Sequence, residues 1–259
     1  MHRRRFLTLP LFMLFARIAR TAAAPPQTRG WYTADVGVLY DMLTFHLEGT
    51  IEETIDRQSG RYHVVIAGQG ASISNRLDAF GILGEKRWMP LHSESWFNVH
   101  GRVSSTKVDY DYTRHTAEYH ARAETFFLRR LRAVDDVLAL APGVQVDDVI
   151  SATLNYADGF WTPQDGVLRT FVVRRRHATD EGPDDVASVY RAELAQLEAR
   201  VSPGTEQGKS TALFDLSPFS SWMRPSRPAR IVFGNNRRPE LINSQMILGS
   251  SVTIRLGVS

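Results

Sequence analysis

The chain has 259 residues, of which 31 are Lys or Arg, 28 are Asp or Glu, 8 are His and none is Cys. Without cysteine the protein has no disulfide, no thiolate nucleophile and no Cys-ligated metal. Five arginines and no acidic residue fall in the first 24 positions, so loss of that segment changes the formal net charge from +3 to −2, which argues against a nucleic-acid partner attracted by a global positive field.

The opening stretch, MHRRRFLTLPLFMLFARIARTAAAPPQ, has the pattern of an export signal. Arginines at positions 3–5 precede an apolar run from Phe6 to Ala16, which is shorter than the about 20 residues that a membrane-spanning helix needs. Small residues then lead to the prolines, as signal cleavage requires. We expect residues 1–24 to be a signal peptide cleaved near Ala24, the protein to reach the periplasm, and the mature chain to have no transmembrane segment.

The arginines leave two export routes open. Arg3 and Arg4, followed two positions later by Phe6 and Leu7, resemble the twin-arginine signal. An ordinary secretory signal with a basic start explains the same residues.

Period-two alternation of apolar and polar residues is the main structural signal in the mature chain. It predicts a strand over Val36–Leu47, a more polar strand over Thr50–Asp56 and a partner strand over Arg61–Ala67. The turn residues at Gln58–Gly60 join the last two strands. The glycine-rich stretch Gly68–Ser72 lacks the spacing of a phosphate-binding loop and is predicted as a turn. These segments indicate an antiparallel meander.

The clearest hairpin spans Lys107–Ala123. In Lys107–Tyr112 one valine and two tyrosines alternate with one lysine and two aspartates, and a turn at Thr113–His115 leads into a second strand over Thr116–Ala123. One face therefore buries aromatic rings and the other meets water, as in an antiparallel sheet with one solvated face.

Shorter strands are expected in the second half of the chain. A turn is expected at Gly234–Asn236, because glycine and asparagine tolerate positive φ. The prolines in Met223–Pro228 favour an extended connection over a central strand. The predicted strands are Leu168–Arg175, Thr211–Leu216, Arg230–Phe233 and Ser251–Leu256.

Two segments depart from the strand pattern. Val146–Tyr156 has apolar residues at helical spacing, with Asp147 and Asp148 as cap residues, and is predicted to form a short helix. The composition of Asp184–Arg200 favours a helix, yet apolar and polar residues also alternate there. The residues alone leave helix and strand open for this segment.

No repeat or low-complexity linker divides the chain, so residues 25–259 are expected to form a single mainly-β domain. The expected architecture is a large antiparallel sheet, curved or partly closed into a barrel, with one or two short helices. A β-sandwich is the alternative.

Three stretches together resemble a family of exported bacterial envelope proteins, the domain of unknown function 3108 family. They are YDMLTFHLEGTIEETIDRQSGRYHVVIAGQG, VDDVISATLNY and RRPELINSQMILGSSVTIRL. The resemblance covers most of the mature chain and rests on pattern and order, without a catalytic motif. It implies an exported, mainly β protein without an assigned activity, and it favours a strand within Asp184–Arg200.

The sequence has no catalytic or metal-binding signature. The serine motif G-x-S-x-G is absent, and no H-x-H or H-E-x-x-H spacing occurs. The paired acids Asp135–Asp136, Asp147–Asp148 and Asp184–Asp185 point apart on a strand or helix, which indicates cap and turn roles. We therefore expect no catalytic residue, no metal and no cofactor. The histidines of the mature chain are His46, His63, His92, His100, His115, His120 and His177.

Aromatic and basic residues are the candidates for ligand binding. The arginines Arg174 and Arg176 lie in a basic run that ends at His177 and could contact an anionic headgroup. A solvated strand end is the simpler explanation of this run. The aromatic candidates for a cavity lining are Trp88, Trp96, Trp161 and Trp222, with Phe97, Phe160 and Phe219. Core packing is the alternative for these aromatic residues.

Export, aromatic alternation and the lack of a catalytic motif lead to one main hypothesis. The protein is expected to be a non-enzymatic envelope module that binds an apolar or amphiphilic, lipid-like ligand, or that docks an envelope protein. The alternative is an exported hydrolase of envelope polymers whose acids and histidines converge on folding. A purely structural assembly partner is the third hypothesis.

Overall fold

The computed structural model describes residues 27–258, except 39, 41, 126, 177–180, 183, 220–222, 224–225 and 247–248. The predicted signal peptide and its cleavage site near Ala24 therefore lie outside the described residues. The same is true of Trp222 and His177.

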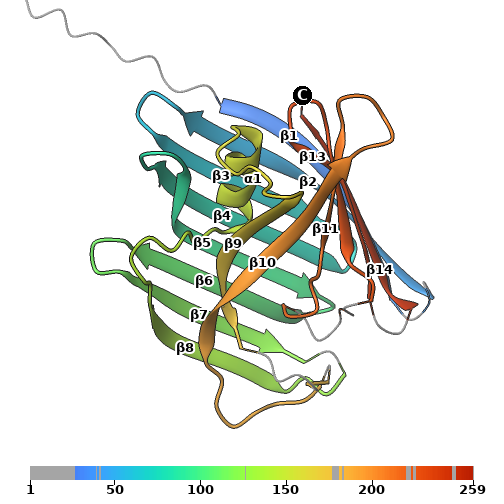
Figure 1. The fold of residues 1–259 in the computed structure, drawn as a ribbon. Helices are drawn as coiled ribbons and strands as arrows, with labels where there is room; N and C mark the ends of the chain where they lie inside the picture. Colours follow the sequence, from blue (N-terminus) through green and yellow to red (C-terminus); the bar gives the residue numbers. More distant parts are fainter. Residues whose placement is uncertain are drawn as a thin grey trace, which may run out of the picture.

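The described residues form one antiparallel sheet of 14 strands and a helix, α1 (Figure 1). This confirms the mainly-β prediction with a single curved sheet, in place of the β-sandwich alternative. The strands are β1 (Gln27–Val38), β2 (Leu43–Asp56), β3 (Arg61–Gln69), β4 (Ile73–Leu83), β5 (Trp88–Val99), β6 (Arg102–Asp111), β7 (Thr116–Glu124), β8 (Leu131–Ala139), β9 (Val167–Arg175), β10 (Ala192–Pro203), β11 (Ser210–Phe214), β12 (Ala229–Phe233), β13 (Pro239–Gln245) and β14 (Ser251–Val258), and α1 is Val149–Ala157.

Strand pairing follows chain order almost everywhere. β1 to β8 form one meander and β9 to β14 form another, and the two are joined because β1 pairs with β14. The edge strands of the sheet are β8 and β9. Short hairpin connections place strands that are consecutive in sequence next to each other in the sheet.

The sheet curls so that its second meander returns over the first. Figure 1 shows β9 and β10 passing across the concave side of β6 to β8. Tyr110, Tyr119 and Val134 of the first meander form one apolar cluster with Ala192 and Phe171 of the second. A hydrogen bond also joins the two meanders, because the Ala192 N–H of β10 donates to Asp136 Oδ2 of β8 at 3.0 Å. The result is a nearly closed barrel.

Helix α1 lies on the concave side, which we call the inner face, against β3 to β5 (Figure 1). Its Ile150 and Leu154 pack with Val64, Ala79 and other apolar side chains of β1 to β5. The helix begins after Asp148, whose side chain accepts a hydrogen bond from the Ser151 N–H. This confirms the predicted helix and its aspartate cap. Among the described residues, no helix has the length and apolar content needed to cross a bilayer.

Two glycines allow an aromatic ring to lie flat on the inner face. A Cβ on Gly49 would come within 2.3 Å of the Tyr32 ring, and one on Gly68 within 2.0 Å of the Tyr32 hydroxyl oxygen. The Tyr32 hydroxyl donates to Asn75 Oδ1 at 2.5 Å. The glycines therefore fix the ring of β1 across β2 and β3, and Tyr32 in turn orients Asn75 of β4.

The prediction of one strand over Val36–Leu47 is wrong. β1 ends at Val38, β2 begins at Leu43, and the two strands pair with each other. Tyr40 between them has a φ of 58°, in the left-handed region that tight turns use. Both strands place apolar residues on the inner face, so apolar and polar residues keep alternating through the turn. The sequence therefore gives no sign that one strand ends and another begins.

The hairpin at Lys107–Ala123, the turn at Gln58–Gly60 and the late strands are confirmed within a few residues of their bounds. In the open segment Asp184–Arg200, β10 begins at Ala192, so the strand reading holds for its second half. The extended connection Met223–Pro228 falls partly outside the described residues. The sequence analysis did not identify β4, β5, β8 or β13.

Candidate functional site

A hollow of about 230 Å³ opens on the inner face of β4 to β6. Strand alternation places two cross-strand rows of inward side chains around it, since Ile73 and Leu77 of β4 and Val108 of β6 belong to the core clusters on that side. The first row is Leu77, Ser95 and Thr106, and the second is Asn75, Phe97 and Ser104. Arg76, Trp96 and Ser105 alternate to the outer face and border the hollow between these rows.

The lining of this hollow is amphipathic. Leu77 and Phe97 supply apolar surface, and Phe97 is 38% exposed. Hydroxyl and amide groups supply the polar surface, from Ser95, Ser104 and Thr106 and from Asn75. Small side chains on β5 and β6 leave the space unfilled, because serine and threonine cannot reach across to the opposite wall. We call this site the inner hollow.

Two tyrosines organise the polar side of the inner hollow. The Tyr32 hydroxyl donates to Asn75, as described above. The Tyr119 side chain hydrogen-bonds Thr106, and burial raises the pKa of Tyr119, so that its hydroxyl stays protonated. Tyr119 also lies within electrostatic range of Arg174 on β9.

A second hollow, of about 320 Å³, lies where the turns after β3 and β5 meet. Its lining is polar and includes Ser72, Ser74, Asn98 and His100. His100 has a φ of 50°, and its N–H donates to the Ser72 carbonyl at 2.8 Å, which ties the two turns together. The predicted turn at Gly68–Ser72 is thus confirmed for its last three residues.

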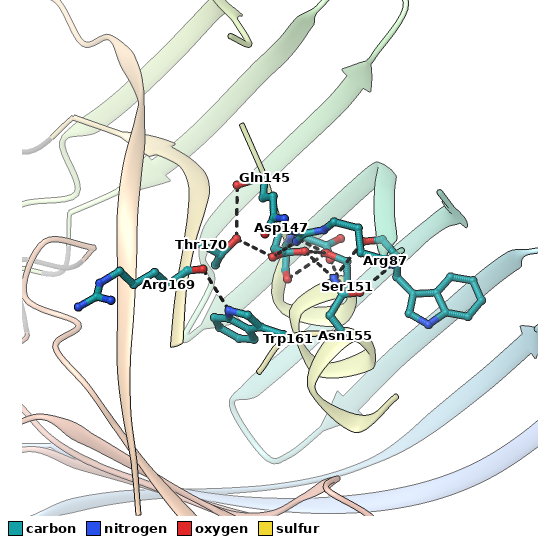
Figure 2. A network of polar contacts seen from close by, with 10 residues as sticks. Arg87, Gln145, Asp147, Ser151, Asn155, Trp161, Arg169 and Thr170 are labelled. Atoms are coloured by element: carbon teal, nitrogen blue, oxygen red, sulfur yellow. Dashed lines mark hydrogen bonds and ion pairs between the residues drawn. The ribbon is translucent and has the colours of Figure 1, made fainter. Parts of the chain in front are cut away.

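The start of α1 is held by a buried polar network centred on Asp147 (Figure 2). Asp147 is fully buried and accepts from Thr170 Oγ1 at 2.6 Å, Ser151 Oγ at 3.0 Å and Asn155 Nδ2 at 3.0 Å. It also forms an ion pair with Arg87, whose side chain is largely buried. The network joins the β4–β5 connection, α1 and β9, so its role is to fix the helix inside the barrel. The predicted cap or turn role for Asp147 is wrong, because tertiary partners from Arg87 and β9 surround it.

Asp148, next in sequence, is buried at the helix start. Burial raises its pKa to about 6, although hydrogen bonds from Ser151 oppose the shift. Its Oδ2 atom is buried and has no hydrogen-bond partner among the described residues. A carboxyl whose pKa is higher when folded than when unfolded destabilises the fold once it ionises.

We expect the free energy of unfolding to fall as pH rises from about 4 to about 6, because the folded state keeps the Asp148 proton that the unfolded state releases. Asp148→Asn keeps a good N-cap and removes the ionisation, so it is expected to stabilise the protein at pH 8 by about 2 kcal/mol. Urea unfolding at pH 4, 6 and 8 measures this. An asparagine variant that retains the full pH dependence contradicts the assignment to Asp148.

Four histidines lie on the outer face, each beside an aspartate of a neighbouring strand. The nitrogen–oxygen distances are 2.7 Å for His46–Asp35, 2.9 Å for His63–Asp78, 2.6 Å for His92–Asp109 and 2.8 Å for His120–Asp135. His100 and His115 occupy turns. Across the described part of the chain, no group of three or more His, Asp or Glu side chains is arranged to hold a metal ion. The four histidine–aspartate pairs lie on separate strand pairs and do not converge in a cleft, so their arrangement gives no support to the hydrolase alternative.

Of the tryptophans named in the sequence analysis, the three that the structure describes are not brought together. Trp88 is fully buried, and its Nε1–H donates to Asp158 Oδ2 at 2.9 Å. Trp161 is 9% exposed, and its Nε1–H donates to the Arg169 carbonyl at 3.0 Å (Figure 2). Trp96 is on the outer face of β5. Trp88 and Trp161 thus pack in different core clusters.

Among the remaining candidates, Phe97 lines the inner hollow and Phe160 is exposed. Arg174 and Arg176 both reach Glu193, at 2.5 Å and 2.8 Å. Phe219 lies under the Arg174 guanidinium, with 5.3 Å from Cζ to the ring centroid.

Sequence reasoning missed the polar residues of the inner hollow, Asn75, Ser95, Ser104 and Thr106. A signal was present in the serines and threonine at alternate positions of β5 and β6, on the face where neighbouring strands carry large apolar residues. Such small polar residues at inward positions mark an interior that side chains do not fill.

Comparisons with known proteins find similarity among solved structures. No family model matches the sequence, and no curated protein matches it. A solved structure that is similar is a β-barrel-like protein of the domain of unknown function DUF1849 from Brucella abortus, with 9% identity and a TM-score of 0.45. The match covers 92% of this chain and 99% of that chain. It neither supports nor excludes the resemblance to the domain of unknown function 3108 family.

Proposed function

We propose that this protein is a non-enzymatic β module that binds an amphiphilic molecule through the inner hollow. The observation that carries this proposal is the lining, in which Phe97 and Leu77 face hydroxyl and amide groups across one space. An aliphatic chain gains binding free energy by covering the apolar side of the hollow. The polar end of the same molecule replaces water at the serines and the threonine.

The volume of the inner hollow limits the size of the ligand that it can bind. Ligand pockets for drug-sized molecules have volumes of about 300–1,000 Å³. At about 230 Å³ the inner hollow suits one short aliphatic chain, or one end of a longer molecule that extends along the inner face.

We also propose that the protein acts outside the cytoplasm, because residues 1–24 have the pattern of a cleaved signal. Membership of the domain of unknown function 3108 family stays a prediction from the resemblance. Docking of an envelope protein, without a small ligand, is the competing outcome of the test below.

Titration calorimetry with 1-octanol tests the proposal. Phe97→Ser removes the larger apolar wall and is expected to weaken binding about 10-fold. Phe80→Ser is the matched control, because Phe80 is a similarly exposed aromatic residue, 43% against 38%, on the outer face of β4. It is expected to leave binding unchanged. Equal loss in both variants, or no binding by the unaltered protein, contradicts the proposal.

A further inference from the structure

One end of the barrel carries exposed apolar side chains at its connections, and the other end does not. Because neighbouring strands are antiparallel, the connections β1–β2, β3–β4, β5–β6, β7–β8, β9–β10, β11–β12 and β13–β14 lie together at one end, which we call the apolar end. The hairpin connections at the opposite end, 57–60, 84–87, 112–115, 204–209 and 234–238, are all described and hold no exposed large apolar residue. The exposed large apolar residues in or next to the described parts of the connections at the apolar end are Tyr40, Met42, Leu43, Phe127, Leu128, Leu131, Val186 and Val189.

The β7–β8 turn holds Phe127 and Leu128 in solvent on a fixed backbone. The Asp184 carboxylate, from the β9–β10 connection, accepts the Phe127 N–H at 3.0 Å and the Leu128 N–H at 2.7 Å. Within the turn, the Thr125 N–H donates to the Arg130 carbonyl at 2.8 Å, and the Arg130 N–H donates to Thr125 Oγ1 at 2.9 Å. A turn that is already ordered loses little conformational entropy when its side chains bind a partner.

The β9–β10 connection presents Val186 and Val189 in the same way. The Ala187 N–H donates to the Tyr190 hydroxyl oxygen at 2.8 Å, and the Tyr190 hydroxyl donates to the Asp185 carbonyl at 3.4 Å. These bonds fix the backbone between the two exposed valines. Since this connection is hydrogen-bonded to the β7–β8 turn, the exposed residues of both form one surface. We call it the apolar patch, and its members are Phe127, Leu128, Leu131, Val186 and Val189.

Two arginines, Arg129 and Arg130, lie within the apolar patch on the β7–β8 turn. Arg129 Nε lies 2.8 Å from Glu124 Oε2, whereas Arg130 is exposed and forms no ion pair among the described residues. The nearby carboxylates of Asp184 and Asp185 accept hydrogen bonds from backbone N–H groups of the two connections. The patch therefore combines exposed apolar side chains with an exposed cation whose charge no described acid pairs.

This combination suits the surface of a lipid bilayer. Binding at the boundary between headgroups and acyl chains becomes stronger with the apolar area that is buried and with attraction between basic side chains and anionic lipids. The position of the patch also agrees with the inner hollow. Phe97, which lines that hollow, lies two residues before Val99, where β5 ends at the apolar end. A bilayer at this end would lie beside the hollow.

We propose that the apolar end docks on the surface of a bilayer that contains anionic lipids. The apolar patch enters the layer of headgroups, and Arg130 lies beside lipid phosphates. This inference does not depend on the proposed function, because binding of vesicles and binding of 1-octanol are measured separately.

Sedimentation with vesicles tests the role of the apolar patch. On vesicles made of equal parts of phosphatidylcholine and phosphatidylglycerol, Phe127→Ser is expected to weaken binding about 10-fold, as for removal of a large apolar side chain. Phe160→Ser is the matched control, because Phe160 lies between α1 and the start of β9 and is 44% exposed, against 48% for Phe127. It is expected to leave binding unchanged. All the proteins carry the same first 24 residues, so a difference between variants reports the described surface.

The same vesicles test the role of the arginine. Arg130→Gln is expected to weaken binding to the mixed vesicles about 5-fold, the effect of one basic residue near an anionic surface. It is expected to leave binding to vesicles of phosphatidylcholine alone unchanged. Arg114→Gln is the control, because Arg114 is an exposed arginine on the β6–β7 turn at the opposite end. Circular dichroism and thermal unfolding check that all variants are folded.

The outcomes separate this inference from the proposed function. Equal vesicle binding by Phe127→Ser and Phe160→Ser overturns insertion of the apolar patch. Equal binding to both kinds of vesicle, or equal loss in Arg130→Gln and Arg114→Gln, overturns the preference for anionic lipids. A protein complex that Phe127→Ser disrupts, with vesicle binding unchanged, assigns the patch to a protein partner and also overturns the inference. Each of these results leaves 1-octanol binding in the inner hollow untouched.

Discussion

Replacement of Asp147 by alanine is expected to lower the free energy of unfolding by about 3–5 kcal/mol, the range for breaking a buried ion pair. The carboxylate has no exposure and holds Arg87, Thr170 and Asn155 in one network. Its removal leaves the largely buried Arg87 guanidinium without its countercharge and leaves donors on α1 and β9 unpaired. Urea unfolding at pH 7 measures the loss.

Asp56→Ala is the control for this experiment, because Asp56 accepts N–H donors from an exposed turn. That change is expected to cost about 1 kcal/mol or less, as for loss of a surface cap. Asp147→Asn retains an acceptor and should fall between the two. A loss below about 1 kcal/mol for Asp147→Ala means that the network does not anchor α1.

Trp88→Ala is expected to cost about 3–5 kcal/mol, as for other large-to-small changes of buried aromatic residues. Trp88 is fully buried, packs edge-on against Tyr62 with 5.7 Å between ring centroids, and donates to Asp158. Its truncation leaves a cavity between β5 and α1. Urea unfolding, compared with Trp96→Ala, measures the difference.

The Trp96 change is expected to cost less than about 1 kcal/mol, since that ring lies on the outer face and is 37% exposed. The comparison also distinguishes the two roles considered for Trp88. A small stability loss together with weaker 1-octanol binding would assign it to a ligand site and contradict its place in the core.

Alternation predicted much of the sheet because most strands have one buried and one solvated face. Val108 and Tyr110 show this, with the outward residues of β6 forming ion pairs such as Lys107–Asp109. The sequence analysis did not identify β4 and β5, because a bulge between Phe80 and Gly81 shifts the register and interrupts the alternation of inward and outward residues. Local periodicity carries no information about such a shift.

The site was less predictable than the sheet. The arginine run suggested Arg174, yet its contact with Phe219 joins residues that are distant in sequence. Asp147 was predicted to be a cap or turn residue. Its partners Arg87 and Thr170 come from other elements, so the local sequence does not show them. The inner hollow is defined by what neighbouring side chains leave empty, and that depends on the curl of the whole sheet.

Crystals grown with 8-bromo-1-octanol test whether the inner hollow binds an alkyl chain, because the anomalous signal of bromine locates the end of that chain. We expect a bromine or alkyl density peak on the inner face between Phe97 and Leu77. Bromine confined to the outer face, or absent from the inner hollow at concentrations that saturate binding in solution, contradicts amphiphile binding in the inner hollow.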